Sequence, residues 1–566
     1  MTPPPPAGQT SPMDVAPRSE DLARGAFTDV GPWVVPARPP WLGAVPAERE
    51  RIAAALPDLV RPARVPPLGR LVRVGRHLVP AVGRWAVGAR RRGGPESRRD
   101  LARRLRIAAE ALGPTYIKLG QIIASGEGLF PAELVAEMRR CRDQVPPEPF
   151  AVVRATVEED LGRPLEKVFA SFERRPLAAA SIAQVHVATL HPDDPDGEPV
   201  PVVVKVQRPR IGELVDADLR VMAWIAPHLV GRIPIAALAN PPALVELFAE
   251  TITEELDFRV EAANMLEVAG VYARLGQDAY VVPRPHPELV TRRVLVMERL
   301  SGFAFEDAEG MRAADIDTQA LVRAGMIGFL EGAMLHGIFH GDLHAGNLLV
   351  LEDGRTALLD FGITGRMGET RRQAFLRMLV TATMNDVRGQ LEAFRDLGAL
   401  PADVDVDEVI RELKLDGPVV DPTNLTPEQL TAEIQATTKA LLGYGARLPK
   451  ELMLFVKNLV FLDGAIATLA PDLDLFAEIA HIATWFADHH GDRIAVEAGV
   501  EGGAWSVDMD GVRALYGVSG DTNVLTHREV QARRDVIASR LAQRERPRLT
   551  HVVADRARGA WRRVRP

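Results

Sequence analysis

The sequence predicts an α+β protein in which a helical extension precedes a small β-rich lobe and a larger helical lobe. Apolar residues recur at helical spacing through residues 68–123. Short segments rich in Val and Ala, separated by turn-forming clusters, follow between residues 168 and 207 and predict strands. Beyond residue 302 the helical pattern returns. The 566 residues are 47% hydrophobic, enough for one large domain or two moderate ones.

These patterns divide the chain into five regions. The first is rich in Pro, Ala and Gly, a composition that disfavours a packed core. The last carries many arginines. The predicted regions are 1–60 (disordered N-terminus), 61–160 (helical extension), 161–302 (β-rich lobe with a helical insertion), 303–500 (helical lobe) and 501–566 (basic C-terminal tail).

Within the β-rich lobe, VFASF, AQVHVATL and VPVVVKVQ predict three antiparallel strands. Helices are expected at 211–230 and 242–266, after which RRVLVMERL predicts another strand. In the helical lobe, LLVLEDGRTALLDFG predicts a hairpin that turns at Asp353 and Gly354.

Composition excludes several classes of protein. Cys141 is the single cysteine, so an internal disulfide is impossible, which fits a reducing compartment. We find no uncharged apolar run of about 18 residues or more, as a transmembrane helix requires. The N-terminus lacks the basic start and apolar core of a signal peptide. We therefore expect a cytoplasmic protein without a transmembrane helix, in which any membrane contact is peripheral, at the inner face.

The net charge of −8 hides a strong asymmetry. Residues 61–106 contain fourteen Arg and two acids, and residues 527–566 contain twelve Arg and four acids. Such basic flanks could contact an anionic membrane surface or nucleic acid. The alternative is a solvated, Arg-rich helix surface. Of the two partners we expect the membrane surface rather than nucleic acid.

The residues that indicate chemistry form two short motifs, HGDLHAGN at 340–347 and Asp-Phe-Gly at 360–362. Phosphoryl transfer from ATP needs one carboxylate near the attacking oxygen, and an Asn and a second Asp that hold Mg²⁺ against the phosphates. Asp342, Asn347 and Asp360 have the spacing of the kinase catalytic loop and metal-binding pair. The motifs therefore predict Asp342 as the catalytic residue and Asn347 and Asp360 as metal ligands. The alternative is an Asn-capped loop beside a chance Asp-Phe-Gly.

A competing interpretation is a metal site built from three histidines. His336, His340 and His344 lie four residues apart and would stack on one face of a helix. That site requires an unbroken helix through Gly337, Gly341 and Gly346, which glycine disfavours.

Lys205 lies in the third predicted strand, where a kinase keeps the lysine that grips the α- and β-phosphates. Of the 68 basic residues only seven are lysines, so a lysine at Lys118 or Lys205 departs from the usage of the chain. Lysine and arginine are not interchangeable where a compact charge must fit a pocket. The alternative is an ordinary exposed strand lysine.

Over about residues 100–480 the chain resembles the AarF/UbiB/ADCK-type family of atypical kinases. Four features carry the resemblance together, of which the HGDLHAGN and Asp-Phe-Gly motifs are one. The other three are Lys118-Leu119-Gly120-Gln121, the alanine-rich Ala178-Ala179-Ala180-Ser181, and Glu255-Leu256-Asp257-Phe258 followed by Glu261.

The resemblance implies an atypical kinase-like two-lobed fold and roles for further residues. Ala178 to Ser181 would replace the glycine-rich nucleotide-binding loop, and their methyl groups and stiffness should alter nucleotide geometry. The backbone of Glu298 and Leu300 would bind adenine. Glu261 would pair with the catalytic Lys205.

Glu255 lies six residues before Glu261 and therefore on another helical face. The resemblance implies that Glu255 pairs with Lys118 and that Lys118 and Gln121 lie over the substrate cleft in a regulatory role. Alternatively, either glutamate is a surface charge.

The function indicated is binding of ATP or ADP with Mg²⁺, with ATPase or phosphotransferase activity. The resemblance implies support of isoprenoid-quinone metabolism, such as ubiquinone biosynthesis, or of membrane-lipid metabolism. A lipid or isoprenoid ligand and biosynthetic enzymes are then expected partners. The rivals are a true protein or small-molecule kinase and a nucleotide-binding pseudokinase scaffold. The phosphoryl acceptor and the oligomeric state stay open.

Overall fold

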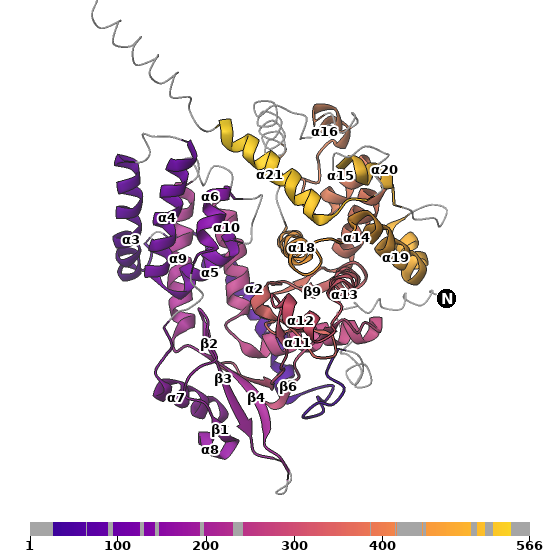
Figure 1. Cartoon of the computed structure of the whole chain (residues 1–566). Helices are drawn as coiled ribbons and strands as arrows, with labels where there is room; N and C mark the ends of the chain where they lie inside the picture. Colours follow the sequence, from indigo (N-terminus) through magenta and orange to yellow (C-terminus); the bar gives the residue numbers. More distant parts are fainter. Residues whose placement is uncertain are drawn as a thin grey trace, which may run out of the picture. The chain divides into compact units, whose positions relative to one another are not determined.

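The chain forms two compact units, described here one at a time from a computed structural model (Figure 1). Unit one comprises Met1–Glu369 and Lys450–Asp463, and unit two comprises Thr370–Pro449 and Gly464–Pro566. The structure describes residues 26–544 except 64, 89–93, 125–129, 142–145, 193–196, 230–240, 385, 414, 416–443, 445, 447–448, 500–506 and 516–523.

The predicted disorder of residues 1–60 is wrong for the second half of that segment. Pro40–Ala44 form a 3₁₀ turn, η2, and Val45–Val60 form helix α2. Helix α2 packs against three helices of unit one. Arg49 donates to Asn264 at 3.0 Å and forms an ion pair with Glu267 at 3.3 Å. Residues 1–25 lie outside the described residues.

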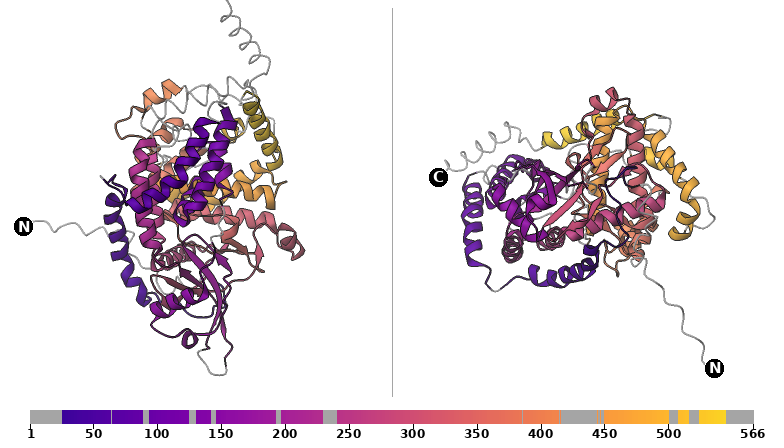
Figure 2. Two further views of the ribbon diagram at one scale, coloured as in Figure 1. Left: turned by 90° about the vertical axis from the view of Figure 1, so that its left-hand side faces the viewer. Right: turned by 90° about the horizontal axis from the view of Figure 1, so that it is seen from below.

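The helical extension is present and consists of five helices among the described residues. A core that includes Trp85, Leu101 and Ile123 joins four of them, α3 to α6. These four helices lie together on one side of the sheet, and they stay grouped in both views of Figure 2. The helices are α3 (Leu68–Val87), α4 (Gly94–Leu112), α5 (Pro114–Ala124), α6 (Ala132–Met138) and α7 (Phe150–Leu161).

The β-rich lobe is a six-stranded antiparallel sheet in the order β1-β3-β4-β7-β6, with β2 paired to β3. The three predicted strands are confirmed as β1, β3 and β4, and the fourth as β7. The strands are β1 (Phe169–Phe172), β2 (Ala178–Ala179), β3 (Ala183–Leu190), β4 (Val200–Gln207), β6 (Pro285–Val290) and β7 (Val294–Glu298), and a short helix α8 (Leu165–Val168) precedes β1.

The side chains of β4 alternate between the two faces of the sheet, and this alternation sets the direction of Lys205. Val202, Val204 and Val206 point into one apolar core, which they share with Val157 of α7. Successive strand residues point to opposite faces, so Lys205 projects from the other face of the sheet.

The insertion between β4 and β6 holds α9 (Ile211–Leu229), α10 (Pro241–Glu254) and α11 (Phe258–Leu275), followed by β5 (Tyr280–Val281). A single helix predicted over 242–266 is wrong. The chain breaks after α10 because Asp257 adopts an extended conformation and caps α11, accepting from Arg259 N at 3.0 Å. This break places Glu255 between two helices.

The remaining part of unit one positions the predicted catalytic motifs. The hairpin is confirmed, with β10 paired to β11 and a positive φ of 85° at Gly354 in its turn. β9 pairs with β12, so the two motifs lie side by side. The elements are β8 (Phe303–Ala304), α12 (Ala308–Ala313), α13 (Thr318–Glu331), η5 (Gly332–His336), β9 (Ile338–His340), η6 (Ala345–Asn347), β10 (Leu348–Val350), β11 (Thr356–Leu358) and β12 (Thr364–Arg366).

Helix α18 (Lys450–Leu469) begins in unit one and ends in unit two. Of the described helices, it alone is long and apolar enough to cross a membrane. Its residue Phe455 packs against Phe329 and Phe339 of unit one, so packing within that unit accounts for part of its apolar character. Its polar residues Lys457 and Asn458 contact the 340–347 loop.

The described part of unit two is helical. A core that includes Leu391, Leu400 and Val409 joins two of its helices. Within the predicted basic tail the structure describes two helices, α20 and α21. The helices of unit two are α14 (Glu369–Thr383), α15 (Val387–Asp396), α16 (Val406–Leu413), α19 (Leu475–Ala498), α20 (Met509–Leu515) and α21 (His527–Arg544).

Candidate nucleotide and metal site

Lys205 is the centre of a buried charge network. Its Nζ lies 2.7 and 2.9 Å from the two carboxylate oxygens of Glu261, in the first turn of α11. The same Nζ lies 3.2 Å from Oδ2 of Asp360. Burial would lower the pKa of Lys205, but the two carboxylates outweigh burial and raise it. The predicted pairing of Lys205 with Glu261 is therefore present, and it extends to the Asp-Phe-Gly segment.

Asp342 follows β9 and is held by a residue that the sequence motifs did not reveal. Lys457 of α18 contacts its carboxylate through Nζ. Burial would raise the pKa of Asp342, but Lys457, Lys118 and His344 together hold it well below its usual range. Asp342 is therefore ionised at neutral pH. The rarity of lysine, which singled out Lys118 and Lys205, could also have indicated Lys457.

Asn458, the neighbour of Lys457, fixes the backbone of the same loop. Its side-chain oxygen accepts from Leu343 N at 3.0 Å, and its Nδ2 donates to the carbonyl of His340. Asn458 is fully buried. Its two hydrogen bonds tie α18 to both sides of Asp342, which orients the carboxylate.

The predicted metal ligands Asn347 and Asp360 present oxygen atoms. Asn347 donates through Nδ2 to the carbonyl of Asp342 at 3.1 Å, which leaves its amide oxygen for another partner. Asp360 accepts from Gly362 N at 2.9 Å, yet its side chain is 44% exposed, against 19% or less for the other charged side chains of the network. Burial raises the pKa of Asp360, but Lys205 and Lys118 lower it to about 2. An ionised, partly open carboxylate beside an amide oxygen fits Mg²⁺, which prefers hard oxygen ligands.

The three-histidine metal site is wrong. His336 ends the π-helical turn η5, His340 lies in β9, and His344 precedes the 3₁₀ turn η6. They therefore do not stack on one helix. Among the described residues, no group of three or more His, Cys, Asp or Glu could hold a metal.

Lys118 of α5 reaches the same network. Its Nζ lies 2.8 Å from Oε1 of Glu255, which is buried, and the side chain of Lys118 is only 14% exposed. Burial would lower the pKa of Lys118, but Glu255, Asp342 and Asp360 raise it. The predicted pairing is present, and the field of Lys118 extends to both aspartates. Gln121 lies one helical turn further along α5, on the side of Lys118.

The site thus gathers residues from α5, β4, α10–α11, the 340–347 loop, the Asp-Phe-Gly segment and α18. Three lysines offset most of the charge of four carboxylates. The lysines are Lys118, Lys205 and Lys457, and the carboxylates are those of Glu255, Glu261, Asp342 and Asp360.

The alanine-rich loop is a tight hairpin that leads from β2 into β3. Ala178 pairs with Val185, and Ala180 N donates to the carbonyl of Ala183 at 2.9 Å. Ser181 is buried at the turn. The role of these residues in nucleotide binding stays a prediction.

The residues predicted to contact adenine lie at the end of β7: Glu298 is its last residue, and Leu300 comes two residues later. The side chain of Glu298 is buried and accepts from Thr28 Oγ1 at 2.6 Å and Arg284 N at 3.1 Å. Its backbone N–H donates to the carbonyl of Arg284 at 2.9 Å. Because this N–H is already bonded, the backbone carbonyl of Glu298 is the group left to contact a nucleotide. Contact with Leu300 stays a prediction.

Replacing Lys457 by Met should lower nucleotide turnover at least tenfold while changing nucleotide affinity much less. The substitution leaves the Asp342 carboxylate without the cation that orients it, and an unpaired buried charge is strongly unfavourable. Turnover and nucleotide affinity should be measured on the same preparation. The matched control is Lys450→Met on the same helix, which removes an ion pair to Glu250 at 3.1 Å and should leave turnover unchanged. Equal loss in both variants would contradict a specific role for Lys457.

His340 gives the fold a defined dependence on pH. Its Nδ1 accepts from Asp342 N at 3.1 Å, so the neutral ring carries its hydrogen on Nε2 and donates to the carbonyl of Asp360. Burial lowers the pKa of His340 to about 4. Between pH 6.5 and 4 the unfolded chain therefore binds a proton that the folded protein does not, and stability falls as the pH falls.

Lowering the pH from 7.5 to 5 should cost about 2 kcal/mol of unfolding free energy through His340. Chemical denaturation at both pH values, with wild type and His340→Asn, measures the difference in pH dependence. His191→Asn, at an exposed histidine, is the control. An unchanged pH dependence in His340→Asn would contradict this assignment.

The ABC1 atypical kinase-like domain matches residues 140–394. The Mycobacterium tuberculosis protein Rv0647c is 38% identical over 378 residues, which cover 65% of this chain and 74% of that protein. A chloroplastic aarF domain-containing protein kinase of Arabidopsis thaliana is 32% identical over 400 residues, which cover 66% and 73%.

Another Arabidopsis thaliana relative, the chloroplastic protein ACTIVITY OF BC1 COMPLEX KINASE 1, is 31% identical over 381 residues, which cover 67% of this chain and 54% of that protein. Among solved structures, Rv3197 of Mycobacterium tuberculosis in its complex with erythromycin covers 59% of this chain and 89% of its own, with a TM-score of 0.34 and 23% identity.

The fold and the site define an atypical kinase-like protein, with a small antiparallel sheet beside a helical lobe that carries the Asp342 loop and the Asp-Phe-Gly segment. The chain belongs to the ABC1 family of atypical kinase-like proteins, the AarF/UbiB/ADCK type.

Proposed function

We propose that this protein binds ATP or ADP with Mg²⁺ in unit one and acts as an ATPase or phosphotransferase. The observation that carries the proposal is the bridge from Lys205 to both Glu261 and Asp360. A kinase-like site needs the lysine, the helix glutamate and the metal-binding aspartate in place together.

The roles of the residues follow from their chemistry. Lys205 holds phosphate oxygens and is oriented by Glu261. Asp342, kept ionised, orients or deprotonates the nucleophile. Asn347 and Asp360 hold Mg²⁺, which when bound neutralises charge on the phosphates.

The position of Lys118 favours an ATPase, or transfer to a small acceptor, over general protein phosphorylation. Its charge lies in the fields of Asp342 and Asp360 and close to Glu255. The extension that carries it thus occupies space near the catalytic carboxylate that a protein substrate would need. A true kinase and a nucleotide-binding pseudokinase scaffold are the rival functions.

The experiment uses ATP labelled at the γ-phosphate and the full chain. Free phosphate and any labelled product are measured with Mg²⁺, with and without anionic liposomes or polyprenyl phenols. Phosphate release that is lost in Asp342→Asn and kept in Asp353→Asn, an aspartate of the β10–β11 turn, supports the proposal. A labelled protein product favours the true kinase, and no turnover under any condition favours the scaffold.

We also propose that the protein works peripherally at a membrane, in isoprenoid-quinone or lipid metabolism. The exposed face of α3 supports this, because Leu68, Val72 and Val79 project from it at 63%, 70% and 69% exposure. Exposed Arg73 and Arg76 accompany them. Apolar side chains flanked by arginines suit a helix that lies on an anionic bilayer.

Several arginines of the basic region 61–106 form ion pairs within the protein, so they are less available to a membrane than the composition suggests. Arg70 is buried against Asp218. Arg98 pairs with Glu133 at 2.9 Å, and Arg106 pairs with Glu137 at 3.1 Å. We therefore place the membrane contact on α3 rather than across the whole region. Of the predicted tail 527–566, residues 545–566 lie outside the described residues.

Binding to anionic vesicles should fall as salt rises, because screening weakens contacts worth on the order of 1 kcal/mol per arginine. Arg73→Gln with Arg76→Gln should weaken sedimentation with these vesicles. The control is Arg174→Gln with Arg175→Gln, two exposed arginines of the β-rich lobe. Equal sedimentation with neutral and anionic vesicles would show that charge does not drive membrane binding.

A further inference from the structure

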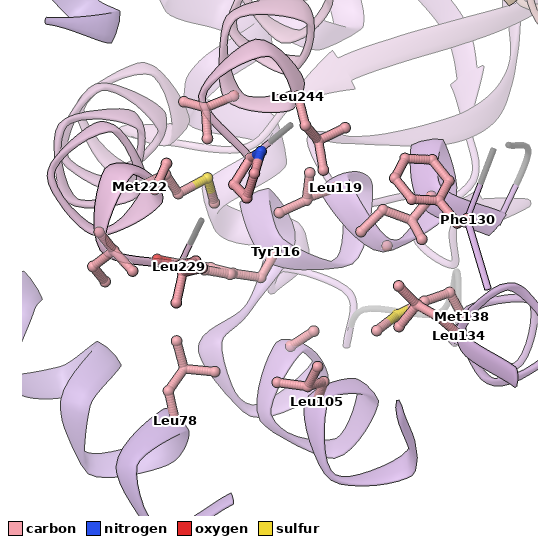
Figure 3. Close-up of a pocket in the computed structure, with 17 residues that line it drawn as sticks. Leu78, Leu105, Tyr116, Leu119, Phe130, Leu134, Met138, Met222, Leu229 and Leu244 are labelled. Carbon is pink, nitrogen blue, oxygen red and sulfur yellow. The ribbon is translucent and has the colours of Figure 1, made fainter. Parts of the chain in front are cut away.

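The helical extension, together with α9 and α10, lines a cavity of about 220 Å³ that is partly open to solvent. Helices α3, α4, α5, α6, α9 and α10 contribute its walls, and side chains from these helices converge on it in Figure 3. Almost every side chain that lines it is apolar; six of them are Leu78, Leu105, Leu119, Met138, Met222 and Leu244.

The size of the cavity selects a class of occupant. Ligand sites are concave, mostly apolar pockets with a small number of polar groups, and this partly open cavity has that character. An engineered apolar cavity of about 150 Å³ in another protein stays free of water and binds benzene. A cavity somewhat larger suits one substituted ring or a short branched hydrocarbon.

Tyr116 adds a polar requirement. It lines the cavity and is 7% exposed. Its hydroxyl finds no hydrogen-bond partner among the described residues. A buried polar group without a partner is unfavourable, and in a native fold it calls for an explanation. A ligand with one polar atom could supply the partner.

Helix α5 connects the cavity with the nucleotide site. Tyr116, Leu119, Gly120 and Ile123 line the cavity and follow the i, i+3, i+4, i+7 spacing of one helix face. Lys118 projects from the opposite face, at 100° per residue, toward Glu255. A ligand that shifts α5 by packing against one face therefore moves the cation on the other.

We infer that this cavity binds a small, mostly apolar molecule with one hydrogen-bonding group, and that its occupancy changes nucleotide affinity through α5 and Lys118. The inference rests on the proposed function and adds a second ligand site to it. Such coupling is reciprocal, so nucleotide must change affinity for the apolar ligand by the same factor.

The first test is binding of toluene and benzyl alcohol to the full chain, measured by calorimetry and thermal shift. Both probes should bind and stabilise the wild type, and benzyl alcohol should bind at least about threefold more tightly because it can pair with Tyr116. Tyr116→Phe should remove that preference. Ala109→Leu, which fills the cavity from α4, should abolish binding.

The control is Ala108→Leu, at a buried neighbour on α4 that does not line the cavity. It should bind both probes. Absence of binding to the wild type, or equal binding to wild type and Ala109→Leu, overturns the proposed site. Equal affinity for the two probes overturns the assignment of Tyr116.

The second test is coupling. Saturating benzyl alcohol should change the Kd for MgATP about fivefold or more, and MgATP should change the Kd for benzyl alcohol by the same factor. Lys118→Met should bind the probe but lose the coupling. If that variant fails to fold, Lys118→Met with Glu255→Met removes both buried charges and serves instead.

Nucleotide affinity that ignores the probe overturns the coupling. Coupling that survives without Lys118 overturns the route through α5. The two hypotheses fail differently. If no nucleotide binds under any condition, the proposed function is wrong and the coupling falls with it. If nucleotide binds but the probes do not, only this inference falls.

Discussion

Replacing Asp360 by Asn should abolish most of the Mg²⁺-dependent affinity for nucleotide, at least about 100-fold. Loss of an outer partner of a metal ligand already costs about 10- to 100-fold in metal affinity, and here the charged ligand itself is lost. Lys205 keeps Glu261 as a partner, 2.7 Å away, so the lysine is not left unpaired. Calorimetric titration of ATP with Mg²⁺ and with a chelator isolates the metal-dependent part.

Asp353→Asn is the matched control, because Asp353 lies in the turn of the β10–β11 hairpin and pairs with Arg355 at the surface. It should keep wild-type affinity. Retention of Mg²⁺-dependent binding by Asp360→Asn would refute the assignment of Asp360 as a metal ligand.

The second large effect is expected at the pair Lys118–Glu255. Removing either residue alone leaves a buried charge without its 2.8 Å partner, which costs about 3–5 kcal/mol. Lys118→Ala with Glu255→Ala removes both charges and should cost clearly less than the sum of the single effects. Each variant that removes Lys118 should also alter nucleotide turnover, since the lysine lies in the fields of Asp342 and Asp360.

Lys167→Ala, at an exposed lysine of α8, is the control and should change stability by less than about 0.5 kcal/mol. Chemical denaturation and turnover are measured for every variant. If the stability losses of the single variants simply add in the double variant, or if turnover does not change when Lys118 is removed, the helical extension has only a packing role.

Local patterns predicted much of the site. The Val-rich composition of VPVVVKVQ, next to a turn-forming cluster, placed Lys205 on a strand, and the hairpin turn at Gly354 follows from Asp-Gly chemistry. The partners Glu261 and Glu255 came from the family resemblance, and both contacts are present.

Other features depend on contacts between distant segments. Lys457 follows Asp342 by 115 residues, and no local pattern joins them. Helix α2 lies in a segment whose Pro, Ala and Gly content suggested disorder, but its contacts with α11 form only in the folded protein. The break before α11 did have a local signal, the capping residue Asp257, which the apolar periodicity concealed.

The cavity beside α5 illustrates the same limit. Helical spacing predicts that Tyr116, Leu119 and Ile123 face a core. Whether six helices fill that core or leave about 220 Å³ open depends on side-chain packing between them.

The central claim is that Lys205, Asp342, Asn347 and Asp360 form one nucleotide–Mg²⁺ site. The most direct test is calorimetric titration of ATP into the full chain and into Lys205→Met, each with Mg²⁺ and with a chelator. The account predicts saturable binding to the wild type that requires Mg²⁺ and weakens at least tenfold in Lys205→Met. Absence of binding to the wild type would contradict the claim. Equal affinity in Lys205→Met and the wild type, or equal affinity with Mg²⁺ and with the chelator, would contradict it as well.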